Sequence, residues 1–168
     1  MSSGTVNGVG ISSGITNFTD SILISQNAST GTLDSASNNT GLGDSVFAAL
    51  TSGDANTAIG KDAMNATTTG SNNVGIGTGA LDTNTTGNLN TAVGRSAMFA
   101  NTTGSNNVAV GFGALDANTT ADNNTALGYN ALTANTTGTD LVAVGMSALT
   151  DNTTGNGNVA VGRFVLGD

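Results

Sequence analysis

The sequence predicts an all-β fold, a parallel β-solenoid or β-roll of about eight coils with 17 residues each. Fixed-period self-similarity is the signature of repeat architectures. An aliphatic residue precedes each repeat glycine, and larger residues alternate with Ala or Gly before it, which is a strand pattern. The repeat glycines, spaced by 17 residues without insertion or deletion, are Gly43, Gly60, Gly77, Gly94, Gly111, Gly128, Gly145 and Gly162.

Three regions follow one another along the chain. Residues 1–20 are polar and glycine-rich, which predicts a flexible or partner-bound N-terminal leader. Residues 21–38 contain the apolar stretch SILIS at an irregular spacing, which is typical of a degenerate capping coil. Residues 39–168 carry the 17-residue repeat.

Each coil is expected to begin with a strand that ends at the repeat glycine. Thr or Val stands three places before the glycine, Ala or Gly two places before it, and an aliphatic residue directly before it. Asn stands four places before it, with Leu141 as the one exception, and is expected to form a side-chain ladder between coils. The ladder residues in the central coils are Asn56, Asn73, Asn90, Asn107 and Asn124.

The residue directly after the glycine varies freely, so we expect it to face outward as a candidate contact column. Its members are Lys61, Arg95, Phe112, Tyr129, Met146 and Arg163. An Ala-Leu or Ala-Met pair follows, in a segment that is either a short strand or one helical turn. Asn-Thr-Thr-Gly then predicts a turn. Its Asn, in Asn84, Asn101, Asn118, Asn135 and Asn152, is either a second ladder or a turn former.

Composition excludes several classes of function. A net charge of −8 with three basic residues argues against nucleic acid and against anionic membrane surfaces. His and Cys are absent, which removes the common catalytic triads and zinc sites. We therefore expect no catalytic residue, no metal and no cofactor. Asp82 and Asp116 share a column but are expected to be solvated turn residues.

The small-residue face of the strand predicts a homotrimer of parallel coils. Side-chain burial within one thin coil is small compared with the entropy of ordering it, so association is expected. A face of Ala and Gly lets another backbone approach closely around a symmetry axis. A single-chain solenoid is the alternative. The predicted trimer-axis face consists of Ala58, Gly75, Ala92, Ala109, Ala126, Ala143 and Ala160.

The motifs NTAVG and NVAVG, with the Gly-x-x-Ala that follows, resemble the repeats of trimeric autotransporter adhesin heads (YadA-like). Those heads are left-handed parallel β-rolls, so the resemblance implies a left-handed trimeric rod. The fuller pattern NTAVGxxALxxNTTG is similar to repeats of bacteriophage fibre and tail-fibre proteins. The resemblance covers residues 39–166.

The function that this resemblance implies is a non-enzymatic viral structural protein. We expect a trimeric phage fibre, appendage or capsid decoration on the virion surface, made in the host cytoplasm. Its partners would be copies of itself, other virion proteins bound through the N-terminal region, and a host glycan or receptor. No nucleic acid and no membrane insertion are expected.

Two alternatives stay open. One is the head domain of a bacterial surface adhesin, located on the cell surface. The other is an ice-binding or self-stacking filament protein, suggested by the threonine files that begin at Thr85 and Thr86. A Thr-Thr pair at a turn does not make a two-rank array, because adjacent residues point to opposite faces.

Overall fold

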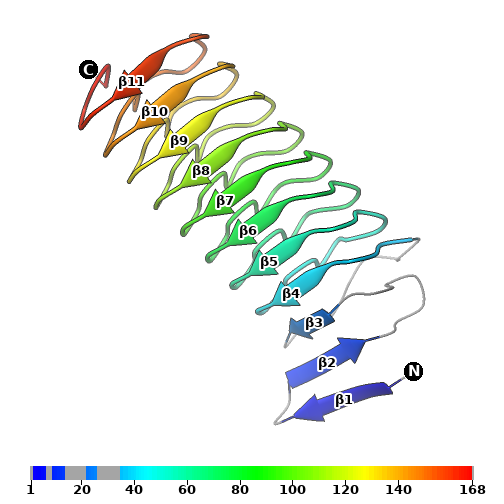
Figure 1. Cartoon of the computed structure of the whole chain (residues 1–168). Helices are drawn as coiled ribbons and strands as arrows, with labels where there is room; N and C mark the ends of the chain where they lie inside the picture. Colours follow the sequence, from blue (N-terminus) through cyan, green and yellow to red (C-terminus); the bar gives the residue numbers. More distant parts are fainter. Residues whose placement is uncertain (1, 7–8, 14–21, 26–34, 168) are drawn as a thin grey trace.

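The computed structural model describes the chain except for residues 1, 7–8, 14–21, 26–34 and 168. The described residues form one sheet of 11 strands that lie side by side in chain order, and they contain no helix. Figure 1 shows the strands as a ladder along a rod. The prediction of an all-β, parallel β-solenoid is confirmed.

The sheet begins with an antiparallel part and continues as a parallel one. β1 pairs antiparallel with β2, β2 pairs antiparallel with β3, and every later pair is parallel. The strands are β1 Ser2–Val6, β2 Val9–Ser13, β3 Ile22–Ser25, β4 Thr40–Leu42, β5 Thr57–Ile59, β6 Val74–Ile76, β7 Thr91–Val93, β8 Val108–Val110, β9 Thr125–Leu127, β10 Val142–Val144 and β11 Val159–Val161.

The N-terminal regions join this sheet where they are described. β1 and β2 lie within the stretch expected to be a leader, and residues 14–20 of that stretch lie outside the described residues. β3 lies in the expected capping coil and pairs in parallel with β4, with Ile22 opposite Thr40. Residues 26–34 of that coil also lie outside the described part.

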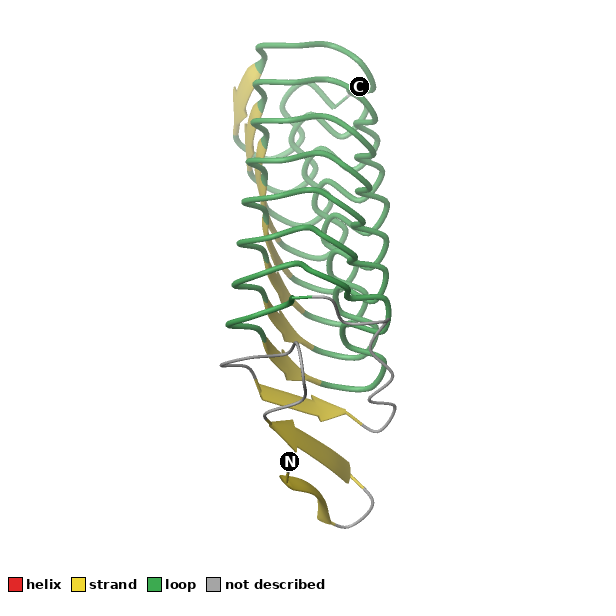
Figure 2. Ribbon diagram, turned by 90° about the vertical axis from the view of Figure 1, so that its right-hand side faces the viewer, coloured by secondary structure: helices red, strands yellow, loops and turns green. Residues whose placement is uncertain are grey.

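One coil supplies one three-residue strand, and its partner lies 17 residues away. Thr91 of β7 lies opposite Val108 of β8, and Val93 lies opposite Val110. The eight strands β4 to β11 therefore bound seven complete coils, where about eight were expected. Figure 2 shows the strands on one side of the rod and the turns on the other.

The strands point their small residues into the coil, which corrects one expectation. The predicted trimer-axis alanines Ala58, Ala92, Ala109, Ala126, Ala143 and Ala160 are buried within the single chain, and Gly75 is buried with them. This face is therefore inside the solenoid and is not a surface that a neighbouring chain can cover.

The narrowness of the coil explains this orientation. A methyl group on Gly75 would lie 2.9 Å from Cγ of Met64, a core residue of the preceding coil. The core consists of this Ala file and of the Ala-Leu or Ala-Met pairs, such as Ala114 and Leu115, with Phe47 towards the N-terminal end. A cross-section this small has no room for a second large side chain, so Val, Ile and Leu face outward.

The Ala-Leu segment is a series of turns, neither a strand nor a helical turn. The buried Leu or Met of each coil has left-handed backbone angles, with φ of 53° at Leu81, 53° at Met98 and 55° at Leu115. Such a conformation costs about 1 kcal/mol or more for a residue with a side chain. The coil accepts this cost because it turns the largest side chain of the segment into the core.

The repeat glycine is required by both conformation and space. Gly94 has a φ of 138°, and a Cβ there would collide with the carbonyl group of Gly111 in the next coil. The same collision recurs from Gly43 to Gly145. This contact accounts for the glycine from Gly43 to Gly145, and at Gly162 the positive φ of 134° remains as the reason.

Candidate interaction surfaces

The outward side of strands β4 to β11 forms a continuous surface, here called the outer strand face. It consists of two files of side chains, one from the first residue of each strand and one from the third. The first file is Thr40, Thr57, Val74, Thr91, Val108, Thr125, Val142 and Val159; the second is Leu42, Ile59, Ile76, Val93, Val110, Leu127, Val144 and Val161.

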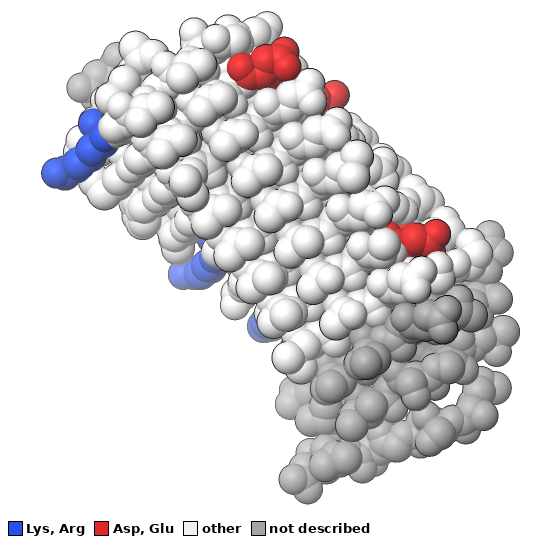
Figure 3. Space-filling model, in the orientation of Figure 1, with Lys and Arg blue, Asp and Glu red and all other residues white. Residues whose placement is uncertain are grey.

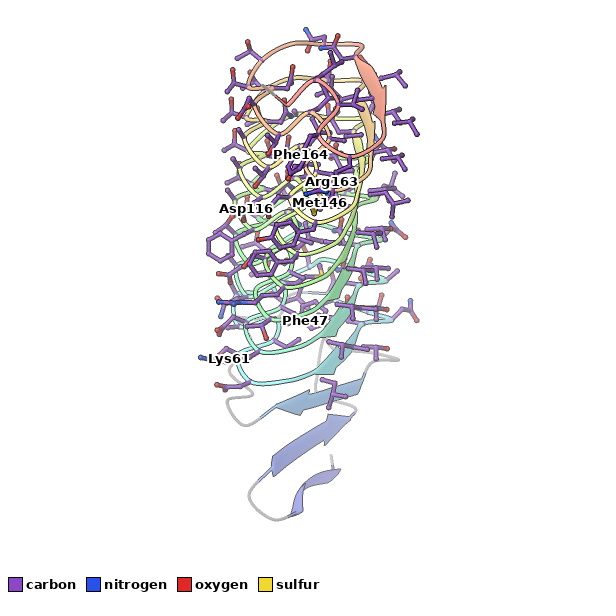
Figure 4. All side chains as sticks on the ribbon, turned by 90° about the vertical axis from the view of Figure 1, so that its left-hand side faces the viewer. Phe47, Lys61, Asp116, Met146, Arg163 and Phe164 are labelled. Atoms are coloured by element: carbon purple, nitrogen blue, oxygen red, sulfur yellow. The ribbon has the colours of Figure 1, made fainter. Side chains whose placement is uncertain are left out.

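The outer strand face is apolar, regular and accessible. Leu42 is 48% exposed, Leu127 45% and Val108 39%, although each lies directly beside a fully buried Ala or Gly in its strand. Figure 4 shows the side chains of this face projecting from the strands. In Figure 3 the broad front surface is uncharged, with basic side chains along one margin and acidic ones along the other.

The expected contact column lies at the corner directly after each strand. All its members are exposed except Met146, which is half-buried. The Phe112 and Tyr129 rings stack with centroids 5.3 Å apart at an angle of 11°. The Arg95 guanidinium lies over the other side of this stack, 5.6 Å from the Phe112 centroid. The faces of the Phe112 ring are in contact with Tyr129 and Arg95, so a partner would meet the edge of Phe112 and the more exposed Tyr129.

The two ends of this column carry charged side chains. Lys61 Nζ lies 3.5 Å from the Asp62 carboxylate, and both side chains are partly exposed. Arg163 lies over the ring of Phe164, 4.6 Å from its centroid. Each cation therefore has a local partner in its own coil, and a contact of this geometry at the surface contributes at most about 1 kcal/mol.

The Asn residues before the strands form a buried ladder, here called the strand-side ladder. The backbone N–H of Asn107 donates to Oδ1 of Asn90 at 3.0 Å, and the same bond recurs from Asn56 to Leu141. The Asn90 amide group donates across the coil to the carbonyl oxygen of Gly104 at 2.8 Å. This ladder therefore joins coils through the backbone and also braces each coil internally.

The Asn residues of the Asn-Thr-Thr turns form a second buried ladder, the turn-side ladder. Asn101 Nδ2 donates to Oδ1 of Asn84 at 2.8 Å and to the carbonyl oxygen of Gly104 at 3.0 Å. Of the two alternatives that the sequence left open, the turn-side Asn residues therefore act as a ladder as well as turn formers. The Gly104 oxygen accepts one amide from each ladder.

The strand-side ladder is interrupted once within the repeat region, and the turn-side ladder begins at Asn84, because Leu50 and Thr67 occupy its positions in the first two coils. Leu141 takes the place of Asn in the strand-side ladder, and it offers no acceptor to Asn158. Thr67 takes the place of Asn in the turn-side ladder, and its buried hydroxyl has no hydrogen-bond partner. The carbonyl oxygens of Gly155 and Gly70, which lie at the corresponding turns, each accept an amide from the other ladder alone.

A third column of polar residues was missed in the sequence. Small hydroxyl residues alternate with Asn or Asp, and from Asp54 onward every member except Thr139 accepts the backbone N–H of the preceding coil through its side chain. For example, the backbone N–H of Ser71 donates to Oδ1 of Asn88 at 2.8 Å, and the backbone N–H of Asn88 donates to Oγ of Ser105 at 3.1 Å. The same kind of residue returns in every second coil, so the column can be found in the sequence by comparing residues that lie two repeats apart. This hydroxyl/Asx column is Ser37, Asp54, Ser71, Asn88, Ser105, Asp122, Thr139 and Asn156.

Asp82 and Asp116 do not form a carboxylate pair, because Phe99 occupies their shared column between them. Both are half-buried, where full solvation was expected. Burial raises the pKa of Asp116 above its usual range, and one of its oxygens is buried without a hydrogen-bond partner. Burial, with a smaller contribution from the Asp62 carboxylate, also raises the pKa of Asp82. Neither geometry brings together an acid and a base.

Within the described residues, no three acidic side chains lie close enough to share a metal ion. The same residues contain no helix with the length and apolar character needed to cross a membrane. Comparison of the chain with protein-family models, curated proteins and solved structures finds no match.

Proposed function

We propose that this protein is a non-enzymatic structural rod, most specifically a trimeric phage fibre, appendage or capsid decoration. The observation that carries the proposal is the outer strand face. It is a long, uncharged and largely apolar surface, whereas the two Asn ladders and the hydroxyl/Asx column serve coil-to-coil bonding. An association face that repeats along a rod suits a structural element.

The mass and shape of the purified protein test the rod. A trimer has three times the chain mass of 16.3 kDa, or about 49 kDa, and light scattering distinguishes it from a monomer. Electron microscopy of the same sample should show a short, straight particle. A folded monomer would contradict the trimer, and a compact spherical particle would contradict the rod.

The location of the protein separates the viral proposal from the adhesin alternative. Gold-labelled antibody against the rod should decorate phage particles if the protein is a virion component attached through its N-terminal region. Labelling of intact bacterial cells without particles would favour the head of a surface adhesin instead.

Contact with a host glycan or receptor belongs to the same proposal. The exposed edges of Phe112 and Tyr129 and the phenol hydroxyl are its candidate contacts. Replacing both residues by Ala should reduce adsorption to host cells by tenfold or more, as expected for an aromatic hot spot of about 1.4 kcal/mol. The mass of the assembly should stay the same. Unchanged adsorption would remove the corner column as the contact.

One observation favours ice binding as a second candidate. The outer strand face presents two ranks of side chains, half of the first rank being Thr, on evenly spaced parallel strands. This is the two-rank array that the Asn-Thr-Thr turns do not provide. Thermal hysteresis in a solution of the monomer would support this candidate, and its absence would exclude it.

A further inference from the structure

We infer that the outer strand face is the surface through which copies of this chain pack on one another, with their rods parallel and their ends aligned. The inference rests on the proposed function, since it assigns the contact surface of the proposed trimer. It replaces the Ala/Gly face, which lies inside the coil.

The extent of the face gives the surface area that association would bury. Seven steps of about 4.8 Å give a strip about 34 Å long, and two files of side chains make it about 12 Å wide. One copy therefore contributes on the order of 400 Å², so a dimer would bury about 800 Å², which is typical of weak contacts. Three copies around an axis bury about 1,200 Å² in total, divided over three pairwise contacts.

The regularity of the face identifies its occupant. Side chains of one file are spaced by the strand separation, because each strand pairs in register with the next. A rigid surface with this period is matched along its whole length only by a surface of equal period. A second copy of the same sheet has that period by construction, whereas an ordinary protein surface matches it at one or two strands.

The charged margins favour the parallel orientation. The basic margin follows the strands, and it carries Lys61, Arg95 and Arg163, with Asp44 and Asp62 at its N-terminal end. The acidic margin precedes the strands, and it carries Asp54, Asp122 and Asp140. Figure 3 shows the two margins on opposite sides of the uncharged face.

Symmetry determines which margins meet. When copies are related by an axis along the rods, the basic margin of one copy lies against the acidic margin of the next. When two rods run in opposite directions, the symmetry axis is perpendicular to them. The basic margin of one copy then lies against the basic margin of the other, and the acidic margin against the acidic margin. Opposite charges at the edge of an interface favour the correct encounter and disfavour the wrong one. The parallel arrangement is therefore preferred.

Mass measurement on variants tests the surface. Leu127 lies on the outer strand face with strands of that face on both sides of it, and Thr137 is exposed on the turn side of the rod. Leu127→Asp should reduce the mass from about 49 kDa to that of the 16.3 kDa chain, and Thr137→Asp should leave it at the trimer value. Circular dichroism should show that both variants keep the β-fold.

Single cysteines test the orientation, because the chain has none of its own. Leu42→Cys and Val161→Cys lie on the face near opposite ends of the rod. In parallel, aligned rods, each variant alone should form an intermolecular crosslink through a disulfide or a short bis-maleimide. This readout stands even if Leu127→Asp fails to fold.

The outcomes separate the inference from the proposed function. A monomeric wild-type protein overturns the proposed trimer itself, and thermal hysteresis of that monomer would assign the face to ice. A wild-type trimer that Leu127→Asp leaves intact overturns the assigned surface while the trimeric rod stands. Crosslinks that form only in a mixture of Leu42→Cys and Val161→Cys overturn the parallel orientation.

Discussion

The two buried Asn ladders use the same side chain in different ways. In the strand-side ladder, Asn90 accepts the backbone N–H of Asn107 and donates to the turn carbonyl of Gly104. In the turn-side ladder, Asn101 donates to the side chain of Asn84 and to that same carbonyl. Loss of Asn90 therefore leaves a backbone N–H without an acceptor, whereas loss of Asn101 leaves only another side chain without its partner. Asn135 differs from Asn101 in the turn-side ladder, because it also accepts the backbone N–H of Gly138.

This difference explains how the interruptions are placed. Leu141 and Thr67 each take the place of a ladder Asn, and they lie near opposite ends of the repeat region. At each of these positions the shared carbonyl still has the amide of the other ladder, as Gly155 has Asn152 and Gly70 has Asn56. At both interruptions the turn carbonyl keeps one amide donor. The presence of two ladders therefore allows one Asn of a coil to be replaced without leaving that carbonyl group unpaired.

The largest effect is expected for Asn90→Ala. The substitution leaves the buried N–H of Asn107 without an acceptor and removes the 2.8 Å bond to Gly104. An orphaned buried donor costs about 1–3 kcal/mol in addition to the lost bond, so we expect a loss of about 3 kcal/mol. Urea unfolding measures the total, and hydrogen exchange at Asn107 should accelerate. Unchanged exchange there would contradict the backbone role of this ladder.

A smaller loss, about 2 kcal/mol, is expected for Asn101→Ala. This variant is the matched partner of Asn90→Ala, because both amides donate to the oxygen of Gly104. It removes the hydrogen bond that Asn101 donates to Asn84 and the one that Asn101 accepts from Asn118. It leaves no backbone N–H without an acceptor. If it destabilises the protein as much as Asn90→Ala, the distinction between the ladders is wrong.

A gain of about 1 kcal/mol is expected for Thr67→Asn, which extends the turn-side ladder by one coil towards the N-terminus. The buried hydroxyl of Thr67 has no partner, whereas the introduced amide can donate to Gly70 and accept from Asn84. The midpoint of urea unfolding should rise. Thr67→Val is the control, since it removes the unpaired hydroxyl without adding an amide and should give a smaller gain. Destabilisation by Thr67→Asn would show that the coil has no room for the ladder at this end.

The smallest net effect is expected for Leu141→Asn. Two new hydrogen bonds contribute about 2 kcal/mol together, and the lost burial of Leu costs about the same. Global stability should change by less than about 1 kcal/mol, while hydrogen exchange at Asn158 should slow. Leu141→Ala, which gives up the packing without adding an amide, should cost about 3 kcal/mol. A large change in the free energy of unfolding of Leu141→Asn would show that the new hydrogen bonds do not offset the lost burial of Leu141.

The sequence was sufficient to predict the architecture. The fixed spacing from Gly43 to Gly162 and the alternation around Ala92 and Val93 predicted parallel, stacked strands, and the structure has them. These features are local or periodic, so one chain displays them without any knowledge of neighbours. The handedness and the trimer do not follow from the described coils and stay predictions.

The orientation of the strand could not be predicted in the same way. Side-chain size suggested that Val93 and Leu127 fill the core and that Ala92 and Ala126 face a neighbour, and the structure has the opposite arrangement. Which face is inside depends on the width of the coil. That width is determined by the left-handed turns at residues such as Leu115, and Leu rarely adopts this conformation. Residue preference alone therefore gives no signal for it.

The hydroxyl/Asx column has a consequence for how such a rod changes in length. Its side chains alternate between Ser or Thr and Asn or Asp, so the bonds within the column join a residue of one kind to a residue of the other kind. Recombination between repeats that adds or deletes two coils preserves every pairing in the column, whereas a change of one coil places two like residues together. Lineages of this gene should therefore differ more often by pairs of coils than by single ones, so that rod length evolves in double steps.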